Sequence, residues 1–192
     1  MLKKKKRKYK SIALIPHNDD ESLFLAYTIM REKPLVIICT DSFIQWERGD
    51  GITNEERTNE SIEAMKLAGA DIEFLHIPDN EPLRLNLLEK LEDLRIKYNP
   101  DIVYAPAQEE GGNMWHNAVG RISKWAMFKK VKQYMTYGSA NYTKTKGSEL
   151  VIPTEEEKAL KKKMLACYPS QMKISCRNFF NNPNATDYES FQ

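Results

Sequence analysis

The stretch SIALIPHNDDE, residues 11–21, decides the fold. Its first half is a short, continuous apolar run, the pattern of a strand that is buried on both faces. Its second half places one imidazole and two consecutive carboxylates directly behind that strand, at His17, Asp19 and Asp20. Carboxylates crowded at a strand end repel each other unless a cation is present. We therefore expect a buried strand that ends in a loop suited to binding a cation.

Apolar runs and helical patterns alternate after this strand. Further strands are predicted at residues 35–40, 71–77 and 101–105, and helices at 22–31, 54–68 and 83–97. Continuous apolar strands that alternate with helices are typical of a parallel sheet covered by helices on both faces. The sequence thus predicts an α/β fold, a Rossmann-like three-layer sandwich with a mostly parallel sheet. The last third is less regular, with an expected strand at 133–137 and a charged helix at 154–167.

The charge is divided unevenly between the N-terminus and the rest of the chain. Seven basic residues lie between positions 3 and 10, whereas the whole chain has a formal net charge of only +2. We predict a basic tail at residues 1–10 and a single domain at 11–192. A run of like charges is usually solvated, and contact with a nucleic acid or a membrane surface is the alternative. The later run Lys161, Lys162 and Lys163 is predicted to be a solvated helix face.

The composition favours a cytoplasmic protein. No stretch approaches the roughly 20 apolar residues that cross a bilayer. The three cysteines, Cys39, Cys167 and Cys176, are odd in number and widely spaced, which is typical of reduced thiols. We expect no membrane span, a small-molecule partner rather than a nucleic acid, and leave a homo-oligomer open.

The histidines suggest how a metal could be held. A histidine three residues before an aspartate, as in His17 and Asp20, can curl with it around one ion. Zinc accepts nitrogen from His and oxygen from Asp, and a catalytic site uses three protein ligands and one open position. The third ligand should come from another loop at the carboxyl ends of the strands, where such sheets bind ligands. The two other histidines of the chain are His76 and His116.

Several motifs resemble the LmbE/PIG-L zinc-dependent N-deacetylases. The family string (P/A)-H-P-D-D-E stands here as PHNDDE at residues 16–21, with only the second proline changed. A helical R-x-x-E appears at 57–60, and the H-x-x-H region with its following glycine at 113–120. The family's A-H-x-S-Q reads ACYPSQ at 166–171, and its closing E-x-F is present at 189–191. The resemblance covers residues 11–191 with the motifs in the family order.

The resemblance implies a function and a set of roles. His17, Asp20 and His116 would hold one zinc ion per chain, and Asp19 would be the general base. Arg57 would grip the substrate, and its planar fork suits a phosphate or carboxylate group. Asp41, Asn113 and Trp115 complete the predicted substrate-binding residues. The implied reaction is removal of an N-acetyl group from an N-acetylglucosamine-type amino-sugar conjugate.

Three further positions depart from the family pattern. Asn113 replaces a histidine that the family is thought to use as an acid or oxyanion partner, and an amide delivers no proton at neutral pH. Trp115 replaces an aspartate, and Tyr168 replaces the C-terminal histidine. Either Asp19 returns the proton, which we favour, or His76 or Tyr168 reaches the site. A catalytically impaired carbohydrate-binding protein on the same scaffold is the alternative function.

Plain structural readings compete with these roles. The residues at 17–20 could be a helix cap with ordinary carboxylates. Arg57 and Glu60 could form only an i, i+3 ion pair on a helix face. Trp46 and Trp115 could pack in the core instead of stacking on a sugar ring.

Overall fold

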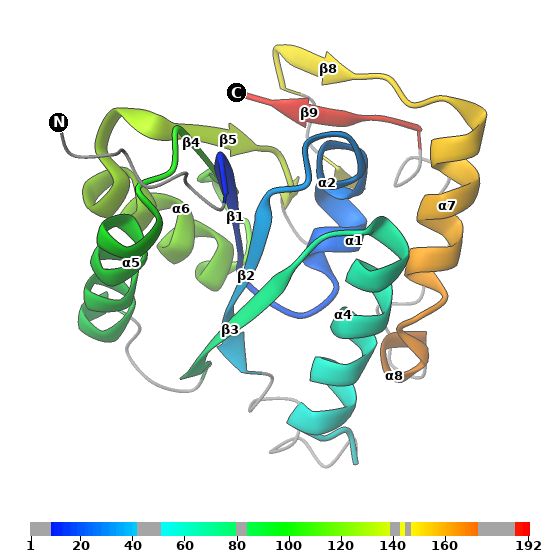
Figure 1. The fold of residues 1–192 in the computed structure, drawn as a ribbon, viewed down its shortest axis with the longest axis horizontal. Coiled ribbons are helices and arrows are strands. Elements are labelled where there is room, and N and C mark those ends of the chain that lie inside the picture. The colour runs from blue at the N-terminus through cyan, green and yellow to red at the C-terminus, as the bar shows by residue number, and fades with distance from the viewer. Residues whose placement is uncertain (1–8, 42–50, 80–83, 139–142, 145–146, 173–186) are drawn as a thin grey trace, which may run out of the picture.

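A computed structural model describes residues 9–41, 51–79, 84–138, 143–144, 147–172 and 187–192 (Figure 1). The described residues exclude three features named above: most of the predicted basic tail, Trp46 and Cys176. Within the described ranges, none of the helices has both the length and the apolar composition needed to cross a membrane.

A seven-stranded sheet forms the centre of the molecule, in the order β3-β2-β1-β4-β5-β9-β8. Its first five strands are parallel, and β9 pairs antiparallel with both β5 and β8 at one edge. The predicted mostly parallel sheet is confirmed. In chain order the strands are β1 (Ser11–Ile15), β2 (Leu35–Asp41), β3 (Ile72–Pro78), β4 (Ile102–Pro106), β5 (Val131–Tyr134), β8 (Glu149–Val151) and β9 (Glu189–Phe191). A separate two-stranded pair joins β6 (Tyr137–Gly138) to β7 (Thr143–Lys144).

Helices cover both faces of the sheet, as predicted. On one face lie α1 (Asp20–Phe24), α2 (Ala26–Glu32), α4 (Asn54–Ala68) and α7 (Glu155–Leu165), followed by the short α8 (Pro169–Met172). On the other face lie α5 (Arg84–Tyr98) and α6 (Met114–Met127) (Figure 1). Strand β1 contributes side chains to the core on both faces of the sheet. Ala13 and Ile15 pack in one core cluster, and Ile12 and Leu14 pack in the other.

The termini of α4 follow the local sequence. The hydroxyl of Thr53 accepts from the backbone N–H of Glu56, and the Glu56 side chain accepts from the backbone N–H of Thr53. This reciprocal pair satisfies donors that a helix start leaves open. Gly69 ends the helix with a left-handed φ of 67°, as its predicted C-terminal position requires.

The prediction of one continuous helix at 22–31 was wrong. Leu25 interrupts it and separates α1 from α2. The buried ammonium of Lys161 donates to the carbonyl of Leu23 at 2.7 Å and lies 4.6 Å from the ring centre of Tyr27. The predicted solvated position of Lys161 was therefore also wrong, because its charge satisfies a carbonyl at the helix break. Lys162 and Lys163 are exposed, as predicted.

The order of the strands determines where a site can form. Strand β1 lies between β2 and β4. The chain adds β2 and β3 on one side of β1 and then β4 and β5 on the other, so the direction of winding reverses between β1 and β4. Ligands of such sheets bind beyond the carboxyl ends of the strands at this reversal. The loop that leaves β1 contains His17. The loop that leaves β4 leads into α6, whose first turn contains His116.

Candidate metal centre

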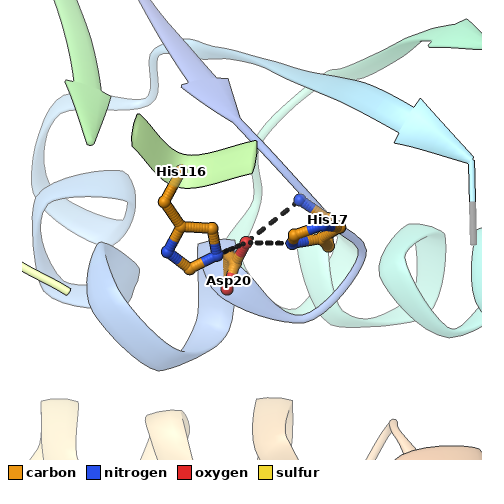
Figure 2. A group of neighbouring side chains, drawn as sticks. All are labelled: His17, Asp20 and His116. Carbon is orange, nitrogen blue, oxygen red and sulfur yellow. Dashed lines mark hydrogen bonds and ion pairs between the residues drawn. The ribbon is translucent and has the colours of Figure 1, made fainter. Parts of the chain in front are cut away.

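Three donor atoms converge at this reversal (Figure 2). His17 follows β1, Asp20 opens α1, and His116 lies in the first turn of α6. One carboxylate oxygen of Asp20 lies 3.3 Å from Nδ1 of His17 and 3.0 Å from Nε2 of His116. All three donor atoms lie within 4.8 Å of one another. Figure 2 shows the two imidazoles on either side of the carboxylate.

The donor set fits zinc. Two imidazole nitrogens and one carboxylate oxygen are a common catalytic zinc set, and ligands about 2.0–2.2 Å from a tetrahedral ion stand roughly 3.3 Å apart. The observed contacts with Asp20 have this spacing. Burial would raise the pKa of Asp20, but His116 and His17 together hold that pKa well below its usual value. The carboxylate is therefore ionised, as a metal ligand must be.

Behind His116 lies a chain of hydrogen bonds. Its Nδ1 is 3.3 Å from the hydroxyl of Thr136, and that hydroxyl lies 3.1 Å from a carboxylate oxygen of Glu109. The backbone N–H of Thr136 also donates to Glu109, at 2.8 Å. A hydroxyl that gives its one proton to Glu109 must accept from Nδ1–H of His116. This tautomer leaves the lone pair of Nε2 for a metal ion beside Asp20.

Sequence reasoning missed Glu109 and Thr136. Glu109 lies in the loop between β4 and α6, but nothing in the sequence pairs it with Thr136. The two residues meet because β4 and β5 are neighbours in the sheet.

Asn18, at the position of the family proline, links residues 16–19 to α4. We call this segment between β1 and α1 the metal loop. Its side-chain amide is buried and donates to the backbone carbonyl of Arg57 at 3.2 Å and to the hydroxyl of Ser61 at 3.0 Å. These bonds hold the loop between His17 and Asp20 against the helix. The substitution therefore replaces the stiffness of proline with a cross-link between two elements.

Asp19 has a backbone conformation that is rare for residues other than glycine, with φ of 110°. Its carbonyl accepts from the backbone N–H groups of Ser22 and Leu23, whereas its side chain makes no capping bond to α1. The carboxylate instead lies 3.3 Å from a guanidinium nitrogen of Arg57. This disfavours the plain capping role for the Asp19 side chain.

Burial raises the pKa of Asp19 well above its ordinary value. The charge of Arg57 opposes this rise, and the nearby carboxylates of Asp20, Glu21 and Glu60 add to it. A carboxyl group with a raised pKa is a stronger base than an ordinary one.

Arg57 and Glu60 join two motifs that are far apart in the sequence. The guanidinium is only 2% exposed and lies 4.0 Å from Glu60. The carboxylate of Glu60 accepts from the backbone N–H and the hydroxyl of Ser170, at 2.7 and 2.6 Å. The pair is therefore part of a buried network, not an ion pair on an exposed helix face.

Tyr168, at the position of the family histidine, is fully buried behind the metal loop. Its hydroxyl donates to Glu21 at 2.6 Å and lies 3.2 Å from the hydroxyl of Ser22. The other carboxylate oxygen of Glu21 accepts from the backbone N–H of Asp19 at 2.9 Å. Tyr168 therefore supports the loop from its buried side. Burial raises the pKa of Glu21, and Tyr168 opposes this rise.

Asn113 and Trp115 organise the start of α6. The side-chain oxygen of Asn113 accepts from the backbone N–H groups of Trp115 and His116, at 2.8 and 3.4 Å. Asn113 is thus the N-cap of the helix that carries His116. Trp115 is 8% exposed and belongs to the core cluster that includes Leu87 and Leu91. This burial favours the packing alternative for Trp115.

Gly120 explains why α6 can approach β4 closely. A Cβ atom at this position would lie 2.2 Å from the backbone carbonyl oxygen of Pro106. Only glycine fits there, and the approach fixes the helix that carries His116 against the strand before it.

Asp41 and His76 pair with each other at the ends of β2 and β3. Nδ1 of His76 is 3.1 Å from the carboxylate of Asp41. The His76 side chain is 62% exposed, and its φ is 51°. The pair is accessible but is not part of the three-residue donor cluster.

The chain is similar to known proteins over most of its length. Residues 12–127 match the family described as PIG-L: GlcNAc-PI de-N-acetylase. No curated protein gives a significant match.

Three solved structures share the fold. A deacetylase triple mutant (Orf2*T) of the teicoplanin biosynthetic pathway has a TM-score of 0.69 at 17% identity, covering 94% of this chain and 95% of the other. The A40926 pseudoaglycone deacetylase Dbv21 has a TM-score of 0.69 at 16% identity, covering 95% of each chain. GalB, the 4-carboxy-2-hydroxymuconate hydratase from Pseudomonas putida KT2440, has a TM-score of 0.65 at 14% identity, also covering 95% of each.

Proposed function

The chain belongs to the PIG-L family of GlcNAc-PI de-N-acetylases, and from this membership we propose that it is a zinc-dependent N-deacetylase. Its proposed substrate is an N-acetylglucosamine-type conjugate, and its proposed cofactor is one zinc ion per chain. The shared fold cannot carry this proposal, since a hydratase has it too. The observation that carries it is the convergence of His17, Asp20 and His116, because two imidazoles and one carboxylate are a donor set that catalytic zinc sites use.

The proposed reaction is hydrolysis of the acetamide. Bound zinc would supply a Lewis acid that makes water a nucleophile at neutral pH and polarises the amide carbonyl. Asp19 takes the proton from the attacking water, and burial favours this role by raising the pKa of its carboxyl group. Arg57 holds that carboxylate in place through their 3.3 Å contact.

The leaving amine needs a proton. Asn113 is an amide that caps α6, and Tyr168 donates its proton to Glu21. We therefore assign the return of the proton to Asp19, which acts first as base and then as acid.

The substrate contacts are proposed separately from the reaction. Asp41 is accessible, since its side chain is 21% exposed and lies beside the exposed His76. The burial of Arg57 and Trp115 favours positioning roles for both. Asn113 would act beside the metal through the amide nitrogen, because its oxygen accepts from the helix backbone.

The experiment compares Asp20→Asn and Asp19→Asn with the wild type. Zinc content and release of free amine from N-acetylglucosamine conjugates are measured on the same preparations. Asp20→Asn should lose zinc and activity together. Asp19→Asn should keep zinc and lose at least about 100-fold in turnover, the size expected for a general base. Asp93→Asn, on the exposed side of α5, is the control and should match the wild type.

Two outcomes would contradict the proposal. A wild-type chain that holds no zinc after reconstitution would contradict the proposed zinc site. Unchanged turnover in Asp19→Asn would contradict the role of Asp19 as the general base. A zinc-loaded chain that binds the sugar but releases no acetate at any pH would support the carbohydrate-binding alternative. Asn113 at the position of the family histidine is the feature that keeps this alternative in view.

A further inference from the structure

The rim opposite the metal centre gathers several chain ends. Helices α5 and α6 return the chain to the starts of β4 and β5, so their last turns lie at the amino ends of the strands. Tyr9, just before β1, packs against Tyr98 of α5 with ring centres 5.5 Å apart. We call the surface formed by Tyr9, Lys10, residues 95–101 and residues 121–130 the amino-end rim.

Contacts between the two helices make this rim continuous. The guanidinium of Arg95, in the last turn of α5, lies 5.2 Å from the ring centre of Phe128, which follows α6. The ammonium of Lys130 donates to the side chain of Asn99 at 3.0 Å and to the carbonyl of Pro100 at 2.6 Å. Figure 1 shows α5 and α6 side by side on one face of the sheet.

Large apolar side chains are exposed on this rim. Ile96 is 71% exposed, Trp125 74% and Phe128 64%. Single exposed apolar residues are ordinary on protein surfaces. Here Trp125 and Phe128 are three residues apart, and Arg95 joins Phe128 to the turn of α5 that carries Ile96.

Positive charge surrounds these side chains. Residues 111–148 contain no Asp or Glu, and Arg121 and Lys124 are exposed next to Trp125. Six basic residues at positions 3–8 precede Tyr9, where the described chain begins. Asp71 and Glu73 accept hydrogen bonds from Tyr9 and Tyr98, and Asp101 is the one acidic residue among those that define the rim. The basic residues of the rim are Lys10, Arg95, Lys97, Arg121, Lys124, Lys129 and Lys130.

We propose that the amino-end rim docks on an anionic phospholipid surface. Trp125, Phe128 and Ile96 enter the headgroup region, while the exposed basic residues of the rim, among them Arg121 and Lys124, meet lipid phosphates. Stable attachment of this kind needs two signals, a basic cluster and an apolar anchor, and the rim has both. A nucleic acid would use the charge and the aromatic rings but would gain nothing from the aliphatic Ile96.

The proposal goes beyond the deacetylase activity and is independent of it. The metal centre lies at the carboxyl ends of the strands, so docking through the amino ends leaves it open to a substrate in solution. Attachment would place the enzyme at a membrane without covering its site.

Flotation of the full chain with vesicles tests the proposal. Vesicles of phosphatidylcholine alone are compared with vesicles that also contain phosphatidylglycerol. We expect binding to the anionic vesicles only, weakened by salt. Arg121→Gln and Lys124→Gln, at two exposed positions of the rim, should each weaken binding about fivefold. Trp125→Gln combined with Phe128→Gln should weaken it by about tenfold or more.

The control is Leu85→Gln, at the opposite end of α5, whose side chain is 80% exposed. It should bind like the wild type. Equal binding to neutral vesicles, or equal binding by the double variant and the wild type, would overturn the proposal. Tight binding of an RNA oligonucleotide that the double variant retains would point to a nucleic acid instead. A dimer that the double variant converts to a monomer would assign the surface to a second copy of the chain.

Discussion

The guanidinium of Arg57 lies 3.3 Å from the carboxylate of Asp19, and this contact joins the metal loop to α4. Asn18 makes a second link from the same loop to the same helix. Glu60, one turn after Arg57, receives two hydrogen bonds from Ser170. Three motifs that are far apart in the sequence thus pack as one unit behind the metal centre.

Arg57 can therefore be tested as a positioning residue. In Arg57→Gln the Asp19 carboxylate loses its charged partner and its fixed orientation. We expect kcat to fall about 100-fold, the usual effect of a small misplacement, with KM and zinc content unchanged. A rise in KM at constant kcat would instead show that Arg57 grips the substrate. Lys66→Gln, on the same helix with an exposed side chain, is the matched control.

Thr136 should control the zinc affinity through His116. Thr136→Val removes the hydroxyl that accepts from Nδ1, so the imidazole can rotate or change its tautomer. We expect zinc to bind about 10- to 100-fold more weakly, as is usual when the partner of a ligating histidine is lost. Competition with a chelator measures this affinity without any activity assay. Thr136→Ser should restore most of the zinc affinity. Normal affinity in Thr136→Val would disprove a role for the hydrogen bonds from Glu109 through Thr136 to His116.

The parallel part of the fold could be predicted because its signals are local. Strands β1, β2 and β4 are mostly apolar runs, β3 is apolar apart from Glu73 and His76, and Gly69 marks the end of a helix. The antiparallel edge was not predicted, because β8 and β9 are each three residues long and pair across a large sequence separation. The break at Leu25 also escaped prediction, since the groups that stabilise it, Lys161 and Glu189, come from the other end of the chain.

The sequence predicted which donor side chains come together, but it did not predict the residues that hydrogen-bond to them. His17, Asp20 and His116 were proposed from spacing and resemblance, and the structure brings their donor atoms together. Glu109 and Thr136 have no motif, since a hydrogen bond between segments that follow two neighbouring strands leaves no pattern in the sequence.

The stability of the chain should depend on acid through Glu157. Arg31 donates two hydrogen bonds of 2.7 Å to its carboxylate, and this pairing lowers the pKa of Glu157 although burial acts in the opposite direction. A lowered folded pKa adds stability above the unfolded pKa of about 4.3, and that stability is lost as the pH falls through the folded pKa.

Glu157→Gln should therefore be less stable than the wild type at pH 7 by no more than about 1 kcal/mol. Below the folded pKa the two proteins should converge. Urea unfolding across this pH range measures the difference, with Glu92→Gln on the exposed side of α5 as control. A difference that stays constant down to the acid range would mean that the charge of Glu157 contributes nothing.

Glu189 should stabilise the fold far more than its place next to the C-terminus indicates. Its fully buried carboxylate accepts from the backbone N–H groups of Tyr27 and Thr28, at 2.5 and 3.0 Å, and from the Thr28 hydroxyl at 2.9 Å. Leu25, the N-cap residue of α2, offers no side-chain cap, so Glu189 supplies both the hydrogen bonds and the negative charge that this helix start favours.

In Glu189→Ala these donors stay buried without the carboxylate, which should cost about 1–3 kcal/mol in the free energy of unfolding. Glu189→Gln should lose less, because its amide oxygen still accepts from the helix. Glu149→Ala, on the adjacent strand with an exposed side chain paired to Lys132, is the control and should change stability by less than about 1 kcal/mol. Equal losses in Glu189→Ala and Glu149→Ala would show that β9 contributes only its strand pairing. A larger loss in Glu189→Ala would mean that the last strand holds α2 in place, and with it the start of the helical layer that carries Asp20.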